Sequence, residues 1–139
     1  MSTNALIALH HPESECFRTI YLHWDGYVEH AGKILVNHYD TFEKVLDLID
    51  LGNLSVLGET LGEKHNFSDH VDGVCTAYGR DRGEANSGHE VVEDTIRALV
   101  QNGAGIPYLY LFMNNSWLMC KPSQERNPKF YPIPKEFKE

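Results

Sequence analysis

The chain has 139 residues, a length that fits one domain with its own hydrophobic core. Its hydrophobic content of 42% and charged content of 23% are ordinary globular values and exclude general disorder. The net charge of −8, spread along the chain without a long acidic run, weighs against direct nucleic-acid binding, because phosphates require a basic face.

Two strands are predicted at the start of the chain. Residues 4–10 form a short apolar run, and residues 17–24 are rich in aromatic and β-branched side chains. Between them, Pro12 cannot continue a ladder and marks a turn. The two strands are therefore expected to form an antiparallel hairpin.

Two helices are predicted next. Helical spacing over residues 28–39 indicates one buried stripe, with Asp25 or Gly26 as the cap: Val28, Ala31, Ile34, Leu35 and His38. Thr41 is expected to cap a second helix, which Gly52 ends. Its apolar face consists of Phe42, Val45, Leu46 and Ile49.

The middle of the chain reads mostly as loops. Residues 53–58 predict a tight, partly buried turn, and residues 59–73 are polar with weak periodicity, as in a loop or an insertion. Residues 74–78 indicate a short strand, followed by a densely charged turn over residues 79–84.

A third helix and a second hairpin follow. Ser87 and Glu90 have capping-box spacing before an amphipathic helix with Val92, Thr95, Ile96, Leu99 and Val100. Residues 108–113 and 117–120 flank Asn114 and Asn115, which predicts a hairpin turn. Residues 122–139 form a proline-rich tail, with one edge strand expected around Phe130, Tyr131 and Ile133.

This order of elements predicts the α+β class within a single domain of residues 1–139. The expected architecture is an antiparallel sheet of about five strands with three helices packed on one face.

The cysteines and the N-terminus indicate the compartment. Cys16, Cys75 and Cys120 form no CxxC pair, so reduced thiols in a cytoplasm are expected in place of disulfides. The first residues lack the basic and apolar regions of a signal peptide, and no apolar run approaches the roughly 20 residues of a membrane span. We therefore expect a cytoplasmic protein with no membrane partner.

The first candidate binding motif is the strand-to-helix turn at residues 23–27. Its imidazole, indole, carboxylate and phenol come from His23, Trp24, Asp25 and Tyr27. Trp24 can stack on a base or a sugar, and Asp25 can accept hydrogen bonds from ribose hydroxyls. The alternative is that Trp24 belongs to the core and Asp25 caps a helix.

The second candidate motif is the charged turn with Arg80, Arg82 and Glu84. Two arginines around Asp81 can form a fork that grips a phosphate or a carboxylate. The alternative is a solvated turn with local ion pairs, which contribute little stability.

The sequence contains few signs of a catalytic site. There are eight histidines, yet there is no HExxH, no HxH, no phosphate-binding loop and no nucleophile elbow. We predict no metal, no cofactor and no catalytic residues, which leaves the enzyme question open.

Three segments resemble a family of small proteins from tailed bacteriophages and prophages. They are Tyr21-Leu22-His23-Trp24-Asp25-Gly26-Tyr27 with Glu29-His30, Leu48-Ile49 with Leu51-Gly52-Asn53-Leu54-Ser55, and Thr76-Ala77-Tyr78 with Arg80-Asp81-Arg82-Gly83-Glu84. The similarity covers roughly residues 1–120. Members of the family often have proline where this chain has Val28, and they lack much of residues 59–73. The resemblance implies a phage origin and an accessory role in an infected bacterial host.

Three functions fit these features. The leading expectation is an accessory protein that acts against host defence by binding and sequestering a small anionic, nucleotide-like ligand without catalysis. The second is a protein-binding inhibitor of a host nuclease or defence complex, suggested by the acidic surface. The third is a metal-dependent nucleotide hydrolase, suggested by the histidines. Self-association into a homo-oligomer stays open.

Overall fold

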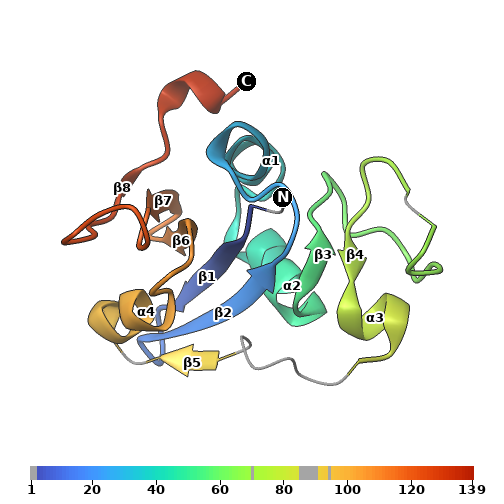
Figure 1. Cartoon of the computed structure of the whole chain (residues 1–139), viewed down its shortest axis with the longest axis horizontal. Coiled ribbons are helices and arrows are strands. Elements are labelled where there is room, and N and C mark those ends of the chain that lie inside the picture. Colours follow the sequence, from blue (N-terminus) through green and yellow to red (C-terminus); the bar gives the residue numbers. More distant parts are fainter. Residues whose placement is uncertain (1–2, 70, 85–90, 94) are drawn as a thin grey trace.

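A mixed β-sheet forms the centre of the molecule. The computed structural model describes residues 3–69, 71–84, 91–93 and 95–139. Neighbouring strands of the sheet follow the order β4-β3-β2-β1-β6-β7-β8 (Figure 1). Strand β5 is not part of this series and pairs with β2. The strands are β1 (Ala5–His11), β2 (Cys16–Leu22), β3 (Leu54–Val56), β4 (Thr76–Ala77), β5 (Val91–Glu93), β6 (Tyr108–Met113), β7 (Ser116–Cys120) and β8 (Tyr131–Pro132).

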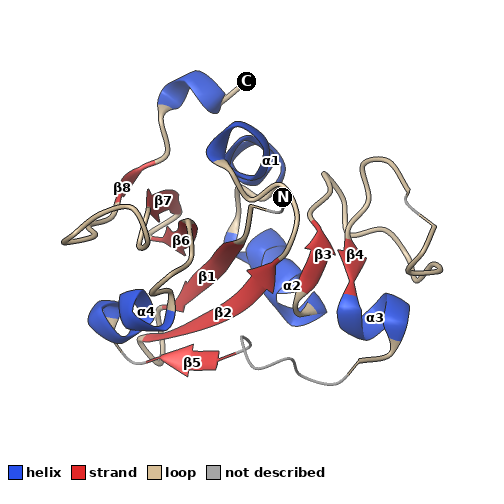
Figure 2. Ribbon diagram, viewed as in Figure 1, coloured by secondary structure: helices blue, strands red, loops and turns tan. Residues whose placement is uncertain are grey.

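The helical elements are short, with α2 the longest (Figure 2). A π-helical turn (Val28–Gly32) leads into α1 (Lys33–His38), and α2 (Phe42–Leu51), α3 (Tyr78–Arg82), α4 (Ile96–Asn102) and a 3-10 turn (Lys135–Phe137) follow. None of the helices in the described part of the chain is long and apolar enough to cross a membrane.

Strand β1 is buried on both faces of the sheet. Ala5, Ile7 and Leu9 face a core shared with α1 and α2, whereas Leu6 and Ala8 face a second core shared with α4. A strand covered on both sides shows a continuous apolar run without alternation. The predicted α+β class is confirmed, but helices cover both faces of the sheet, so their expected location on one face is wrong.

The sheet is also larger than predicted and is not purely antiparallel. Strand β1 pairs antiparallel with β2 and parallel with β6, and β2 pairs parallel with β3 through Leu22 and Leu54. Residues 53–58, expected as a turn, supply β3. The sequence just before α4, expected as helix, contains β5. The predicted capping box at Ser87 and Glu90 lies outside the described residues; instead, Thr95 caps α4 by accepting from the backbone N–H of Ala98 at 3.0 Å.

Local signals in the first half were more reliable. Thr41 caps α2 by accepting from the backbone N–H of Lys44, and Gly52 ends it at a φ of 92°. The helix predicted over residues 28–39 begins as the π-turn, with Tyr27 at its N-cap and no capping side chain, so capping by Asp25 or Gly26 is wrong. His38, expected in the buried stripe, is exposed.

The two predicted irregular segments have different roles. Within residues 59–73, the described part contains no helix or strand beyond an isolated bridge from Thr60 to Val74. The C-terminal tail instead packs back on the protein. Its strand β8 pairs with β7, Ile133 is buried, and the backbone carbonyl of Phe137 accepts from the side chain of Asn37 at 2.9 Å.

Candidate functional site

The turn at residues 23–27, called here the Trp24 turn, is held by backbone hydrogen bonds on both sides. The N–H groups of His23 and Trp24 donate to the carbonyls of Leu54 and Ser55, each at 3.0 Å. These bonds continue the parallel pairing of β2 with β3 beyond the last paired residues. The backbone that carries the Trp24 side chain is therefore bonded to the edge of β3.

Gly26 secures the other side of this turn. Its N–H donates to the carbonyl of Thr3 at 2.8 Å, and its carbonyl accepts from the buried hydroxyl of Tyr110 at 2.6 Å. A Cβ at this position would lie 2.7 Å from the Cβ of Ala5, so the close approach of the two backbones requires glycine.

The aromatic side chains of the Trp24 turn face solvent. Trp24 is 44% exposed and Tyr27 is 36% exposed, so the alternative in which Trp24 belongs to the core is wrong. Asp25 is also exposed and adopts a left-handed φ of 56°. The turn thus presents an indole, a carboxylate and a phenol on the protein surface.

A network of polar side chains from His23, Tyr21 and Asn4 lies next to the indole ring of Trp24. The imidazole of His23 lies edge-on to the ring of Trp24, with centroids 4.7 Å apart and planes at 86°. The Nδ1 atom of His23 lies 2.9 Å from the hydroxyl of Tyr21, which accepts from the side chain of Asn4 at 2.7 Å. Burial, with Tyr78 nearby, raises the pKa of Tyr21, so its hydroxyl stays protonated.

Arg80 has a structural role. Its guanidinium has five N–H donors, and protein oxygens accept from all five. The acceptors are the carboxylate of Asp81, twice, and the carbonyls of Leu61, Gly62 and Cys75, at 2.7–3.2 Å. The guanidinium is therefore not free to form the predicted fork around an anion. Instead, it attaches residues 61–62 to α3 and β4.

Asp81 is the buried partner of Arg80. Its side chain is inaccessible to solvent, and its carboxylate also accepts from the backbone N–H groups of His65 at 3.0 Å and Ala77 at 2.8 Å. Burial opposes ionisation of Asp81, but the hydrogen bonds from Arg80, Ala77 and His65 outweigh it and hold its pKa below the usual value.

Arg82 and Glu84 remain at the surface and bind each other. The guanidinium of Arg82 forms an ion pair with Glu84. It also lies over the rings of Phe67 and Tyr78, 4.7 and 5.2 Å from their centroids. Half of the Arg82 side chain is exposed, so it is the accessible cation of this segment.

The two motifs are joined through Asn53, although their functional side chains do not meet. The side-chain oxygen of Asn53 accepts from the backbone N–H of Tyr21 at 2.8 Å, and its backbone carbonyl accepts from the N–H of Tyr78 at 3.1 Å. However, the Trp24 turn follows β2 and α3 follows β4, with β3 in between (Figure 1). Because β2 runs parallel to β3 and β4 runs antiparallel to it, the Trp24 turn and α3 also leave opposite ends of these strands.

Cavities occur elsewhere on the protein. One of about 460 Å³ lies at the tip of the first hairpin beside Phe42 and Leu46, and one of about 290 Å³ lies beside His30 and His38. A third, of about 310 Å³, lies under the C-terminal tail. None of these three is lined by His23, Trp24, Asp25, Tyr27, Arg80, Arg82 or Glu84.

Sequence reasoning missed Asn53, Tyr78 and Phe67. A buried asparagine directly after a helix-ending glycine was the available signal for Asn53, because a polar side chain in an otherwise apolar segment must find partners. Phe67 had no such signal, since its contact with Arg82 depends on how the loop folds back.

The histidines in the described part of the chain form no metal-binding cluster, and two of the thiols, Cys75 and Cys120, are buried. Within the described ranges, no three His, Cys, Asp or Glu side chains are grouped to hold a metal ion. Burial raises the pKa of the Cys75 thiol, and burial with Glu125 nearby raises the pKa of Cys120 to about 12. Both groups are therefore protonated thiols at neutral pH.

No protein-family model, curated protein or solved structure matches the chain. The resemblance to phage and prophage proteins rests on the sequence motifs.

Proposed function

We propose that the protein is a non-catalytic binding protein that recognises a host defence protein through the Trp24 turn, as an accessory protein of a phage or prophage. The supporting observation is the exposure of Trp24 and Tyr27 on a turn bonded to β3 and to the N-terminal segment. Tryptophan and tyrosine are the residues that most often dominate protein interfaces. A rigid turn loses little conformational entropy on binding.

The charge of the protein suggests the kind of partner. A chain with a net charge of −8 attracts basic surfaces and repels phosphate backbones. A host protein with a basic face, such as a nuclease, fits this charge. The aromatic turn would then provide the buried centre of the interface, and the surrounding acids would guide the encounter.

A nucleotide-like anionic ligand is the second candidate, and the half-exposed guanidinium of Arg82 favours it. An elongated nucleotide would have to reach from Trp24, on which its base would stack, past β3 to Arg82, which would bind a phosphate. Arg80 has no part in this candidate, since protein oxygens accept from all of its donors.

Matched variants test the first candidate. A photoreactive phenylalanine analogue at position 24 or 27 should cross-link one host protein, which is then purified for direct binding. Trp24→Ala and Tyr27→Ala should each weaken binding by tenfold or more. Ile96→Ala and Tyr131→Ala are controls of equal exposure, 44% and 36%, outside the turn. Equal affinities for all four variants would reject the proposed surface.

Calorimetry separates the second candidate from the first. Cyclic and ADP-ribose-type nucleotides are titrated into the wild type, Trp24→Ala and Arg82→Gln. A nucleotide that binds the wild type and is lost in both variants would replace the protein partner by a small ligand. Absent heats with folded wild-type protein would remove this candidate.

A further inference from the structure

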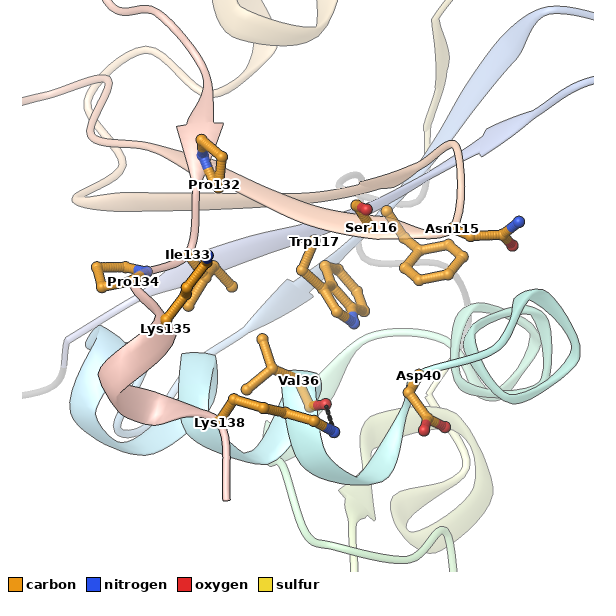
Figure 3. Close-up of a pocket in the computed structure, with 11 residues that line it drawn as sticks. Val36, Asp40, Asn115, Ser116, Trp117, Pro132, Ile133, Pro134, Lys135 and Lys138 are labelled. Atoms are coloured by element: carbon orange, nitrogen blue, oxygen red, sulfur yellow. Dashed lines mark hydrogen bonds between the residues drawn. The ribbon is translucent and has the colours of Figure 1, made fainter.

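A preformed groove lies between the C-terminal tail, α1 and the hairpin of β6 and β7 (Figure 3). Its volume is about 310 Å³, at the lower end of the range for small-molecule sites. Apolar groups from three separate parts of the chain line it: Val36, Phe112, Trp117, Pro132, Ile133 and Pro134. It shares no residue with the Trp24 turn.

The apolar floor is fixed in position. Trp117 and Ile133 are 6% and 7% exposed. The indole N–H of Trp117 donates to the carbonyl of Tyr39 at 2.7 Å, and the backbone N–H of Ile133 donates to the carbonyl of Trp117 at 3.3 Å. Because the polar atoms of this floor already have partners, its free surface suits an apolar body.

Two ammonium groups border the groove. Lys135 begins the 3-10 turn and Lys138 follows it in an extended conformation, and Figure 3 shows their side chains pointing toward different parts of the groove. Lys138 donates to the carbonyl of Val36 at 3.0 Å, drawn as a dashed line in Figure 3. Lys135 has no ion pair within the described part of the chain. Asp40, at the other end of the groove, is already paired with Lys44 at 3.2 Å.

We propose that this groove binds a small amphipathic anion: a carboxylate carried by an aromatic or branched aliphatic body. The carboxylate would lie against the ammonium group of Lys135, and the body would lie on Trp117, Val36 and Ile133. Exposed lysines on an acidic protein supply the charge complementarity. The volume limits the body to one or two rings.

Two probes of the same shape and opposite charge test the chemistry. Naphthalene-2-carboxylate and 2-(aminomethyl)naphthalene are titrated into the 15N-labelled full chain, and the indole N–H signals of Trp117 and Trp24 are followed. The carboxylate should shift the Trp117 signal with a millimolar or lower Kd, and the amine should bind at least tenfold more weakly. Equal binding of the amine, shifts confined to Trp24, or no shift at 10 mM carboxylate would each overturn the proposal.

Lysine variants test the site. Lys135→Gln should weaken binding of the carboxylate about fivefold, the effect of one ammonium contact in water, whereas Lys138→Gln, which removes an ammonium held by the carbonyl of Val36, should have a smaller effect. Lys129→Gln removes the same charge from an exposed residue outside the groove and should leave the Kd within twofold. Unchanged affinity in Lys135→Gln, with an unperturbed spectrum of the free protein, would overturn the assignment of that lysine.

Discussion

The side-chain carbonyl of Asn53 accepts a hydrogen bond from the backbone N–H of Tyr21 at 2.8 Å. Tyr21 directly precedes the last residue of β2, and Asn53 directly precedes β3, so this bond fixes the start of β3 beside the end of β2. The backbone carbonyl of Asn53 then receives the N–H of Tyr78, the first residue of α3. One buried asparagine therefore joins β2, β3 and α3.

Asn53→Ala should destabilise the protein by about 1–3 kcal/mol, because the N–H of Tyr21 loses the buried side-chain oxygen of Asn53 as its acceptor. Urea denaturation followed by circular dichroism measures the free energy of unfolding. Gln101→Ala, at an exposed position in α4, is the control and should change it by less than about 0.5 kcal/mol. Equal effects of the two substitutions would contradict the role of Asn53.

Arg80→Ala should cost about 3–5 kcal/mol, because it leaves the buried carboxylate of Asp81 without its charged partner. It should also release the loop, so that trypsin cleaves faster after Lys64. Arg82→Ala, at a half-exposed ion pair, should cost less than about 1 kcal/mol. If the two variants were equally stable and equally resistant to trypsin, the structural role of Arg80 would be wrong.

Acid should remove the stability that Asp81 provides. The folded-state pKa of Asp81 is held below the ordinary aspartate value of 3.8, so its contribution is present above pH 3.8 and is lost as the pH falls further towards the folded pKa. The difference in unfolding free energy between wild type and Asp81→Asn should therefore be constant near neutral pH and shrink below pH 3.8. A difference independent of pH down to 2.5 would show that the ionised carboxylate is not the stabilising form.

Truncation of the two tryptophans should reduce the free energy of unfolding by very different amounts. Trp117→Ala should cost about 3–5 kcal/mol, since its ring is 6% exposed and contacts Phe112 at a centroid distance of 5.2 Å. Trp24→Ala should cost less than about 1 kcal/mol, since its ring is 44% exposed. Thermal melts of both variants measure this difference, and a large loss for Trp24→Ala would return that residue to a core role.

Turn chemistry and caps could be predicted because they depend on neighbouring residues. Asn114 and Asn115 occupy the turn between β6 and β7 at φ values of 54° and 60°, as the hairpin prediction required. Both hairpins formed as expected. The parallel pairing of β1 with β6 could not be foreseen, since no local pattern in residues 5–11 selects a partner at residues 108–113.

The candidate site could be predicted only where it depends on neighbouring residues in the sequence. A strand-to-turn transition indicated where Trp24 lies, but its exposure depended on how Gly26 meets the N-terminal segment. Arg80 was misassigned because carbonyls of Leu61, Gly62 and Cys75 accept from it, and only the folded loop brings them there. The residues next to an arginine in a charged segment do not indicate whether it binds a ligand or has a structural role.

The parallel register of β1 with β6 has a consequence for biosynthesis. Ala5 pairs with Tyr108, so the central strand of the sheet lacks one neighbour until most of the chain has left the ribosome. Until then, the hairpin of β1 and β2 has an unpaired edge along β1, and Leu6 and Ala8 lie on a face that Leu99 and Leu109 do not yet cover. Pairing over so long a separation also slows folding. A nascent chain that stalls before residue 108 should therefore be prone to aggregation and to capture by chaperones.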